Sequence, residues 1–497
     1  MDQQIPSPPP ASSAVGSVAG SSGHAHGGHA KPDEAPSPLA SQIEGAYSRI
    51  GVTGAHRHIG LMILLGVFFD ALEQNAVGIT GPVLREAWGL GGLEIGLLNT
   101  MTFTATALGR ILTGLVADRF GRRNMLIINL IIFAAGSLLC AVAPNYPILA
   151  AGRFIVGFGL GGEIAVAVIM MAEFFAAKHR GTAVGLINVT AAGLGNMLAP
   201  AFGILVFTLF TGEDRWRWVF GLLFIPAILV MWFRRYVPET PRFLASKGRI
   251  EEANLVITRL ARGKLSGPIP DPEPYLTHHP HLETAPTGPQ ATWMDALRGK
   301  YLSRTALLCV AVCMSYAAQI SMLTLMPTIL VSRGYAVNTS LWFTLVMQSG
   351  SLVGAATAAF LASRLPRKKV LTAAAAIGFA AGLSMAFLAT DIVWIVVFGF
   401  LFNFAVIILN TTIWVFAPEH YPTHTRGFGT SIILAAGSLS GGLFPLISGA
   451  IFDVAGIPGM FATLAALFLV LAIVVQFPPE TFGKPMEESE EAAIYGH

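Results

Sequence analysis

Charged residues are scarce in this chain of 497 residues, since Asp, Glu, Lys and Arg together make up only 12% of it. Soluble domains carry about a quarter of their residues as charged side chains, so this chain lacks the polar surface that water requires. Apolar residues make up 54% of it, and the mean hydropathy is +0.63. We therefore expect the protein to lie in a lipid bilayer. The net charge of +3 is small and gives no reason to expect binding to nucleic acid.

Cysteine is also scarce, because only Cys140, Cys309 and Cys313 occur, and all three lie in apolar runs. Their spacing fits neither a zinc site nor a disulfide framework, so we expect them to be small packing residues. The sequence contains no nucleotide fingerprint, no nucleophile–base set and no ATP-binding domain. We therefore expect no enzyme activity, no cofactor and no metal, and energy drawn from a gradient of an ion or a solute.

The first 45 residues lack the apolar core of a signal peptide and are rich in Pro, Ser, Gly and Ala. This composition favours disorder, and we assign residues 1–55 to a disordered cytoplasmic tail. The tail contains His24, His26 and His29. A solvated spacer is the favoured interpretation, and a metal-binding tail is the alternative.

Apolar stretches of about 20 residues recur along the chain, each long enough to cross a bilayer as a helix. The alternating ten-residue segments of a membrane β-barrel are missing, and helices satisfy every backbone group inside lipid. The sequence therefore predicts an all-α membrane protein with 12 transmembrane helices. The predicted spans are 59–79, 95–117, 125–143, 148–172, 183–210, 217–233, 305–330, 341–362, 370–390, 392–416, 428–451 and 459–477.

The basic residues predict the orientation of these spans. Of the 31 Lys and Arg residues, 25 fall in segments on the side of the two chain ends and four fall in loops on the other side. Basic residues favour the cytoplasmic side, so we expect a multi-pass protein of the cell membrane with both termini in the cytoplasm. A long loop divides the spans six and six. The expected domains are a first bundle at 56–235, a cytoplasmic loop at 236–303, a second bundle at 304–478 and a cytoplasmic tail at 479–497.

The two groups of six spans share a sequence pattern at nearly one offset. Arg122 follows span two and Arg367 follows span eight, 245 residues later. Glu173 and Glu419 end spans four and ten, 246 residues apart, and a Pro-Glu-Thr segment recurs after 241 residues. Three matches in the same order predict duplication of a six-helix unit. Two pseudo-symmetric halves suit a transporter with a central site between them.

With these motifs the chain resembles the major facilitator superfamily from about residue 55 to residue 484. The segment GLVADRFGRR matches the superfamily's loop motif between spans two and three. The segments GRFIVGFGLGGE, PETPRFLASKGR, PEHYPTHTRG and PETFGK resemble the branch that holds sugar porters and metabolite:proton symporters. The second-half loop departs from the pattern, with Ser363 in place of Asp and Pro366 in place of Gly. The resemblance implies the major facilitator fold and a weaker electrostatic latch in the second half.

The resemblance also implies a cytoplasmic gate. Gly114 would let span two approach its neighbour closely, and Asp118 would lie at the N-terminus of span eleven, where the helix dipole favours an anion. Basic residues of the loop motifs would pair with acidic residues and hold this side shut in one state. The alternative is that the arginines only anchor the topology. The other gate candidates are Arg119, Arg122, Arg123, Glu173, Arg180, Glu239, Arg367, Glu419, Arg426 and Glu480.

Ionisable residues inside a span cost about 2.5–3.5 kcal/mol each, so they usually face a cavity or a partner. Asp70 and Glu73 share one face of span one, Arg153 and Glu163 lie in span four, and Arg110 in span two lies close enough to the cytoplasmic end to snorkel. In the resembled branch an acid of span one and an arginine of span four serve in proton coupling, and Asp70 and Arg153 match them. We expect Asp70 to carry the proton, with the other acids of these two spans as further coupling candidates. The alternative is a static ion pair between the two spans.

Polar residues in otherwise apolar spans are candidates for substrate binding near mid-membrane. Three of them on span ten, two amides and an indole, fall on one helical stripe that suits a ring with polar edges. Packing between helices is the alternative role for such amides. The candidates are Asn188, Asn196, Tyr316, Gln319, Gln348, Asn403, Asn410 and Trp414.

We therefore predict a secondary active transporter that carries out proton-coupled symport of a small organic metabolite by alternating access. An organic or aromatic acid is favoured over a sugar, because Arg153 accompanies an amide–indole lining. The alternatives are a sugar porter, a proton-coupled drug or metabolite exporter, and a non-transporting solute sensor. An exporter is disfavoured because Ala199, not glycine, precedes Pro200 in span five. The expected partners are a small-molecule substrate, protons and the lipid bilayer, and the protein is expected to be a monomer.

Overall fold

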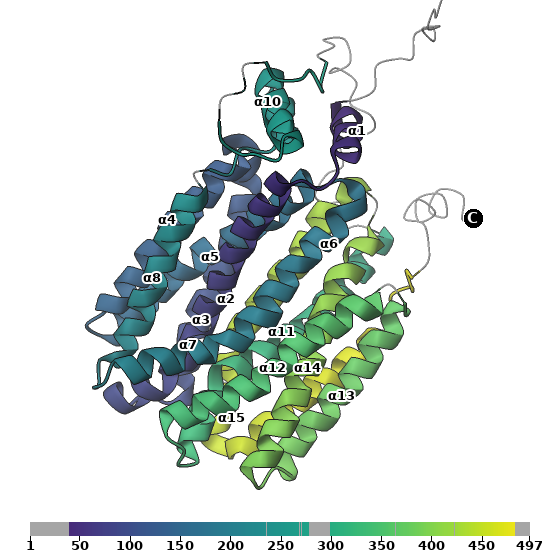
Figure 1. Ribbon diagram of the computed structural model, residues 1–497. Coiled ribbons are helices and arrows are strands. Elements are labelled where there is room, and N and C mark those ends of the chain that lie inside the picture. The colour runs from purple at the N-terminus through teal and green to yellow at the C-terminus, as the bar shows by residue number, and fades with distance from the viewer. Residues whose placement is uncertain are drawn as a thin grey trace, which may run out of the picture. The chain divides into compact units, whose positions relative to one another are not determined.

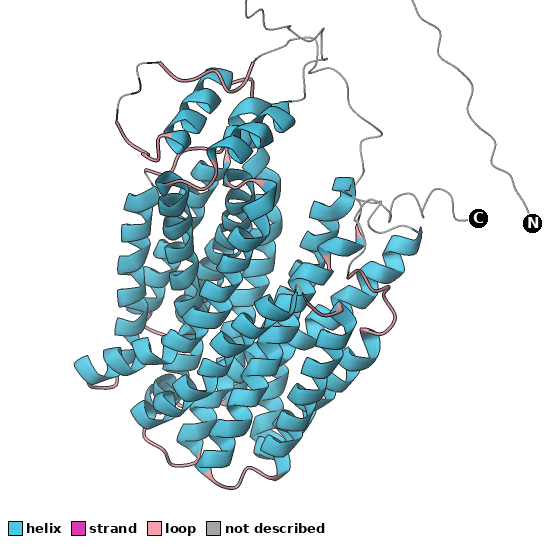
Figure 2. Cartoon of the chain, turned by 45° about the vertical axis from the view of Figure 1, so that its right-hand side comes forward, coloured by secondary structure: helices cyan, strands magenta, loops and turns pink. Residues whose placement is uncertain are grey.

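The computed structural model describes residues 39–482, apart from 235, 268, 270, 278–298, 363 and 422. All regular structure in these residues is helical (Figures 1 and 2). The elements are α1 (Leu39–Ile50), α2 (Gly54–Trp88), α3 (Gly92–Phe120), α4 (Arg122–Val142), α5 (Tyr146–Phe174), α6 (Ala177–Asn188), the π-helix η1 (Val189–Gly195), α7 (Asn196–Leu209), α8 (Arg215–Arg234), α9 (Pro241–Ser246), α10 (Ile250–Ala261), α11 (Gly299–Ser332), α12 (Val337–Ala362), α13 (Arg367–Phe387), α14 (Ile392–Phe416), η4 (Pro418–His420) and α15 (Thr423–Val474).

Each predicted span overlaps a helix in this structure, although the ends differ in places. Among the described residues, nine helical segments are long and apolar enough to cross a membrane. Helix α15 contains two predicted spans, because the backbone breaks at Gly456, where φ is 64° and ψ is −160°. Helices α6 and α7 form one span through η1, so the π-helical turns do not end that span.

Large apolar side chains are exposed on the outside of these helices. Leu209 and Phe387 are 65% and 66% exposed, far more than water would favour for residues of this size. They agree with a protein whose surrounding solvent is lipid, as its composition predicts.

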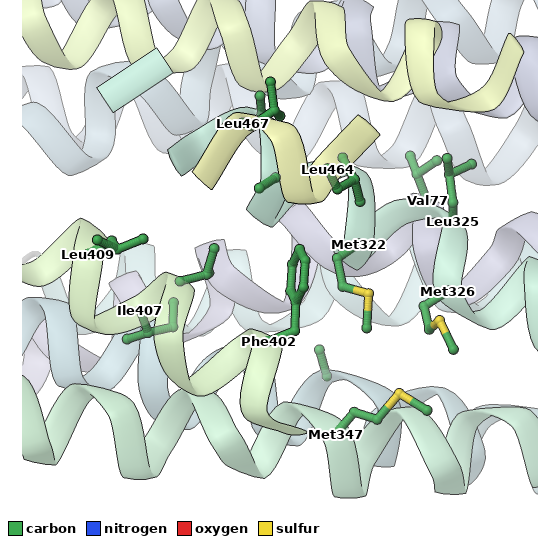
Figure 3. Packing of buried hydrophobic residues seen from close by; sticks show 14 of the residues in the cluster. Val77, Met322, Leu325, Met326, Met347, Phe402, Ile407, Leu409, Leu464 and Leu467 are labelled. Atoms are coloured by element: carbon green, nitrogen blue, oxygen red, sulfur yellow. The ribbon is translucent and has the colours of Figure 1, made fainter. Parts of the chain in front are cut away.

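The hydrophobic core of the second half lies between α11, α12, α14 and α15. Figure 3 shows Phe402 of α14 close to Met322 of α11 and Leu464 of α15. The Phe402 ring also meets Phe461 and Phe468 edge-on, at centroid distances of 6.4 and 5.1 Å. These contacts hold the helices that carry the polar residues described below.

The two halves meet through glycines at one end of the bundle, which we call the distal end and which carries the loops at 89–91 and 333–336. A side chain at Gly78 of α2 would collide with the carbonyl of Leu323 on α11, and one at Gly449 of α15 would collide with the carbonyl of Gly92 on α3. The backbones of α2 and α11, and of α3 and α15, are therefore in contact there. The structure is closed at its distal end.

Three short helices, α1, α9 and α10, lie at the opposite, proximal end (Figure 1). Glu44 of α1 binds Arg180 at 3.2 Å and Arg242 at 3.0 Å, and Thr53 donates to the carbonyl of Leu260 on α10 at 2.7 Å. Residues 39–50 were expected to belong to a disordered tail, but they form helix α1. This segment is ordered because Tyr47 and its apolar neighbours on α1 are buried against this end of the bundle.

Candidate functional site

Glu73 of α2 and Arg153 of α5 form an ion pair in which both side chains are fully buried. Arg153 also donates from Nε to Thr102 at 3.1 Å, and its guanidinium lies 5.5 Å from the centre of the Phe220 ring. Glycines of α5 allow this approach, because a side chain at Gly157 would collide with the carbonyl of Thr102. The partner expected for Arg153 was Asp70, but the structure gives it Glu73, which lies one turn further along α2.

A second buried pair joins Glu163 of α5 to Arg234 at the end of α8. It packs directly against Gly66 of α2, where a side chain would collide with the guanidinium. Asp70 lies one helical turn beyond Gly66 and beside Glu163. Arg234 is 2% exposed, although the sequence analysis ends span six at residue 233 and names no role for Arg234. The signal that could have found it is its position directly after an apolar run, opposite an unpaired acid in span four.

The three buried acids outnumber the two buried arginines that accompany them. Asp70, Glu73 and Glu163 each have one carboxylate oxygen that is buried and has no hydrogen-bond partner among the described residues. Buried polar atoms normally have a partner, and a buried charge without compensation is costly. Uptake of one proton would bring the group to zero net charge, so this arrangement is suited to binding and releasing a proton.

A polar cluster of side chains from α11 and α14 includes four of the predicted substrate residues. Asn410 donates to Gln319 at 2.5 Å and accepts from Ser315 at 2.6 Å. Trp414 donates from its indole nitrogen to the hydroxyl oxygen of Tyr316 at 3.1 Å. The cluster therefore presents amides, a phenol and an indole together in the second half.

The other predicted substrate residues form no hydrogen bond with this cluster in the described part of the chain. Asn403 donates to the carbonyls of Met347 and Gly399, at 3.4 and 3.0 Å, which is a packing role between α14 and α12. The predicted stripe on span ten is therefore divided. The remaining three residues have separate contacts: Asn188 donates to Thr411 at 2.5 Å, Asn196 accepts from Asn75 at 2.9 Å, and Gln348 accepts from Ser351 at 3.0 Å.

The predicted repeat is present as two matching ion-pair clusters at the proximal end. In the first half Arg122 binds Glu173 at 3.4 Å, and Glu173 accepts from Thr240 at 2.5 Å. In the second half Arg367 binds Glu419 at 3.1 Å, and Glu419 accepts from Thr481 at 2.5 Å. Each arginine also lies over a phenylalanine ring that follows the Pro-Glu-Thr segment, Phe243 at 5.0 Å and Phe482 at 5.3 Å.

A second acid completes each cluster by accepting hydrogen bonds from the backbone. Glu239 accepts from the amides of Arg122 and Arg123 at 3.1 and 3.2 Å, and Glu480 accepts from those of Arg367 and Lys368 at 3.1 and 3.0 Å. Burial raises the pKa of Glu239 despite these bonds. Burial also acts to raise the pKa of Glu480, but hydrogen bonds from four backbone amides outweigh it and lower that pKa.

All of these proximal contacts join elements of one half. The gate interpretation expects such pairs to hold this side shut in one state, and in this structure the pairs fix the α3–α4 and α12–α13 turns within their own bundles. Arg180 binds Glu44 of α1 and not an acid of the loop motif. Arg119 is exposed. The side chains of Gly114, Asp118 and Arg426 lie outside the described part of the structure, as do His24, His26 and His29 of the tail.

Groups of His, Cys, Asp and Glu able to hold a metal ion do not occur among the described residues. The three cysteines are free thiols, and Cys140 is buried between α4 and α5. The described polar side chains therefore include a buried group of acids and arginines in the first half and a polar cluster in the second half.

Comparison with known proteins links these features to transport. The family model of the Major Facilitator Superfamily matches residues 63–445. The niacin transporter NiaP of Acinetobacter baylyi is 31% identical over 452 residues, which cover 90% of this chain and 99% of that protein. The gallate transporter of Pseudomonas putida is 26% identical over 434 residues, covering 84% and 90%. A partially occluded inward open structure of the xylose transporter XylE from E. coli matches this structure with a TM-score of 0.68 at 18% identity. The match covers 87% of this chain and 99% of that one. At this low identity the match establishes only a shared fold.

Proposed function

Because the chain belongs to the Major Facilitator Superfamily and is a membrane transporter, we propose that it carries out proton-coupled symport of a small organic acid. The cell membrane is its proposed location, with both termini in the cytoplasm. We propose that it works as a monomer, with the six-helix halves at 56–235 and 304–478 moving against each other around the central site.

The observation that carries the proposal is the group of three buried acids and two buried arginines. Asp70 is the residue proposed to take up the proton, because it has a buried oxygen without a hydrogen-bond partner among the described residues and its carboxylate lies beside that of Glu163. A proton shared by this pair removes the repulsion between two close negative charges. Arg153 and Glu73 are proposed to hold α5 against α2 while this proton comes and goes.

The substrate class is supported by the polar cluster and by the relatives. Niacin and gallate, named in two relatives, are both aromatic carboxylates. An indole, a phenol and two amides suit an aromatic ring with polar edges, and Tyr316, Gln319, Asn410 and Trp414 are the residues proposed to line it. A sugar is the second candidate, since a glucose transporter GlcP of Staphylococcus epidermidis is 25% identical over 447 residues, covering 86% of this chain and 96% of that protein.

Uptake by the purified protein in proteoliposomes tests the proposal. With an inwardly directed proton gradient imposed, wild type should accumulate an aromatic or other carboxylate. Sugars should fail to compete with this uptake. Asp70→Asn should lose uphill accumulation and keep counterflow exchange, because exchange needs no net proton movement. Asp391→Asn removes an exposed acid and serves as the matched control. Uptake of a sugar alone, or accumulation by Asp70→Asn equal to that of wild type, would contradict the proposal.

A further inference from the structure

Arg110 of α3 carries a positive charge in the interior of the bundle, and its hydrogen bonds to described residues all go to neutral groups. Its Nη1 atom donates to the carbonyl of Leu434 at 3.2 Å and to the hydroxyl of Ser438 at 2.9 Å, both on α15 of the other half. Among the described residues no carboxylate forms an ion pair with it. In contrast, the fully buried arginines Arg153 and Arg234 are neutralised by Glu73 and Glu163.

The guanidinium of Arg110 has further hydrogen-bond donors besides Nη1. Its Nε and Nη2 atoms make no hydrogen bond within the described part of the chain, and neither is among the side-chain atoms sealed from solvent without a partner. Both atoms therefore keep some accessible surface in this structure. Arg110 does not turn toward the membrane surface, as a snorkelling side chain would, because Nη1 points across the interface between the halves to α15.

An aromatic wall lies beside this cation. The Tyr316 hydroxyl is near enough to Arg110 for the two groups to interact electrostatically, and Trp414 donates to that same hydroxyl. Gly437 of α15 makes room for the Tyr316 ring, since an added Cβ there would lie 3.4 Å from its Cγ atom. Arg110 thus stands next to the polar cluster of α11 and α14, and it comes from the opposite half.

Two neutral hydrogen bonds lower the cost of a cation in this position but do not cancel its charge. A ligand carboxylate would cancel it, and the Nε and Nη2 atoms form a fork that can donate two parallel hydrogen bonds to the oxygens of a carboxylate. We propose that Arg110 binds the carboxylate of the substrate while Tyr316 and Trp414 line the space for its ring. The sequence analysis attributed the expected preference for acidic substrates to Arg153. In the structure, Glu73 already neutralises the charge of Arg153.

This assignment rests on the proposed function, because it needs a transported acid. It also gives a physical reason for substrate binding to draw the halves together, since Arg110 belongs to the first half and the aromatic wall belongs to the second. A bound acid would bridge α3 to α11 and α14 across the interface.

Ligand binding to the purified full-length protein tests the assignment apart from transport. Nicotinate, benzoate and gallate are titrated against wild type with thermal unfolding as the readout, each beside its neutral carboxamide. Wild type should bind at least one of the acids and discriminate strongly against its amide. Arg110→Gln should bind that acid about 100-fold more weakly and no longer distinguish it from the amide, because a charge-assisted bidentate contact is lost. Arg333→Gln, which removes a distal arginine, should behave as wild type.

A second variant guards against a folding defect in the first. Arg110→Lys keeps the charge but loses the fork, and we expect binding about 10-fold weaker with partial discrimination. Wild-type affinity and discrimination in both folded variants would overturn the assignment and leave the proposed function intact. Failure of wild type to bind or transport any carboxylate would overturn the proposed function, and the assignment with it.

Discussion

The side chain of Asp453 lies at the N-terminus of helix α3, where its Oδ2 atom accepts a hydrogen bond from the backbone amide of Leu93 at 3.2 Å. Its other oxygen accepts from the amide of Gly92 at 3.3 Å. Asp453 belongs to the second half and α3 to the first, so an anion of one half caps a helix of the other. This is the relationship that the sequence predicts for Asp118 at the opposite end of the same two helices, and here it helps to keep the distal end closed.

Asp453→Ala should therefore favour opening of the distal end. Loss of an N-cap costs about 1 kcal/mol, which corresponds to a roughly five-fold shift toward states in which α3 and α15 have separated. Spin labels at residues 214 and 390, with the three native cysteines replaced by serine, would report this shift as a larger population at long distance. Asp391→Ala is the matched control, because Asp391 stands at the start of α14 without making a side-chain cap bond. An unchanged distance distribution would mean that this cap does not stabilise the closed distal end.

The buried pair of Glu73 and Arg153 should contribute strongly to the stability of the fold. Glu73→Gln leaves Arg153 buried without compensation, and breaking such a pair costs about 3–5 kcal/mol. We expect a large fall in melting temperature in detergent and low membrane abundance, with partial recovery in the double variant Glu73→Gln, Arg153→Met. Glu44→Gln is the control, since Glu44 and its two arginines are about a third exposed and should contribute at most about 1 kcal/mol. Equal stability of the two single variants would show that burial does not decide the outcome.

The sequence predicts the helices and the repeat well for physical reasons. Apolar length alone identifies a span in lipid, and the offset between Arg122 and Arg367 leads directly to the two matching clusters. It does not predict which acid pairs with which arginine. Asp70 and Glu73 lie on one face of α2, so spacing allows either to face Arg153. The choice depends on where α5 and α8 cross α2, and Gly66 of α2 leaves room there for the side chains of Glu163 and Arg234.

Stability should depend on pH differently in the two proximal clusters. The pKa of Glu480 is lowered in the folded protein, so its carboxylate stabilises the fold above its ordinary pKa of about 4.3, and that contribution is lost as the pH falls through the lowered value. Glu480→Gln should therefore lower the melting temperature near pH 7, by the equivalent of about 1 kcal/mol after solvent screening, and have less effect as the medium is acidified.

Glu239 is the matched position in the first half, and its pKa is raised. Folding disfavours its ionised form, so its effect on stability is opposite to that of Glu480. At neutral pH the Glu239 carboxylate stabilises the fold less than a neutral group of the same shape would. Glu239→Gln should leave the melting temperature near pH 7 unchanged or slightly higher. A pH-independent loss of equal size in both variants would contradict this account of the two clusters.

The two asparagines of α14 should separate substrate binding from packing. Asn410 bonds to Gln319 and Ser315 in the polar cluster, so Asn410→Ala should raise the KM for the transported solute about 10-fold with a modest loss of stability. Asn403 donates only to backbone carbonyls, so Asn403→Ala should leave KM near the wild-type value and lower the melting temperature by loosening α14 against α12. Initial rates of uptake in proteoliposomes, with the amount of reconstituted protein measured for each variant, give both quantities. If Asn403→Ala changed KM as much as Asn410→Ala, the stripe predicted from helical spacing would act as one binding surface, and the division that these hydrogen bonds indicate would be wrong.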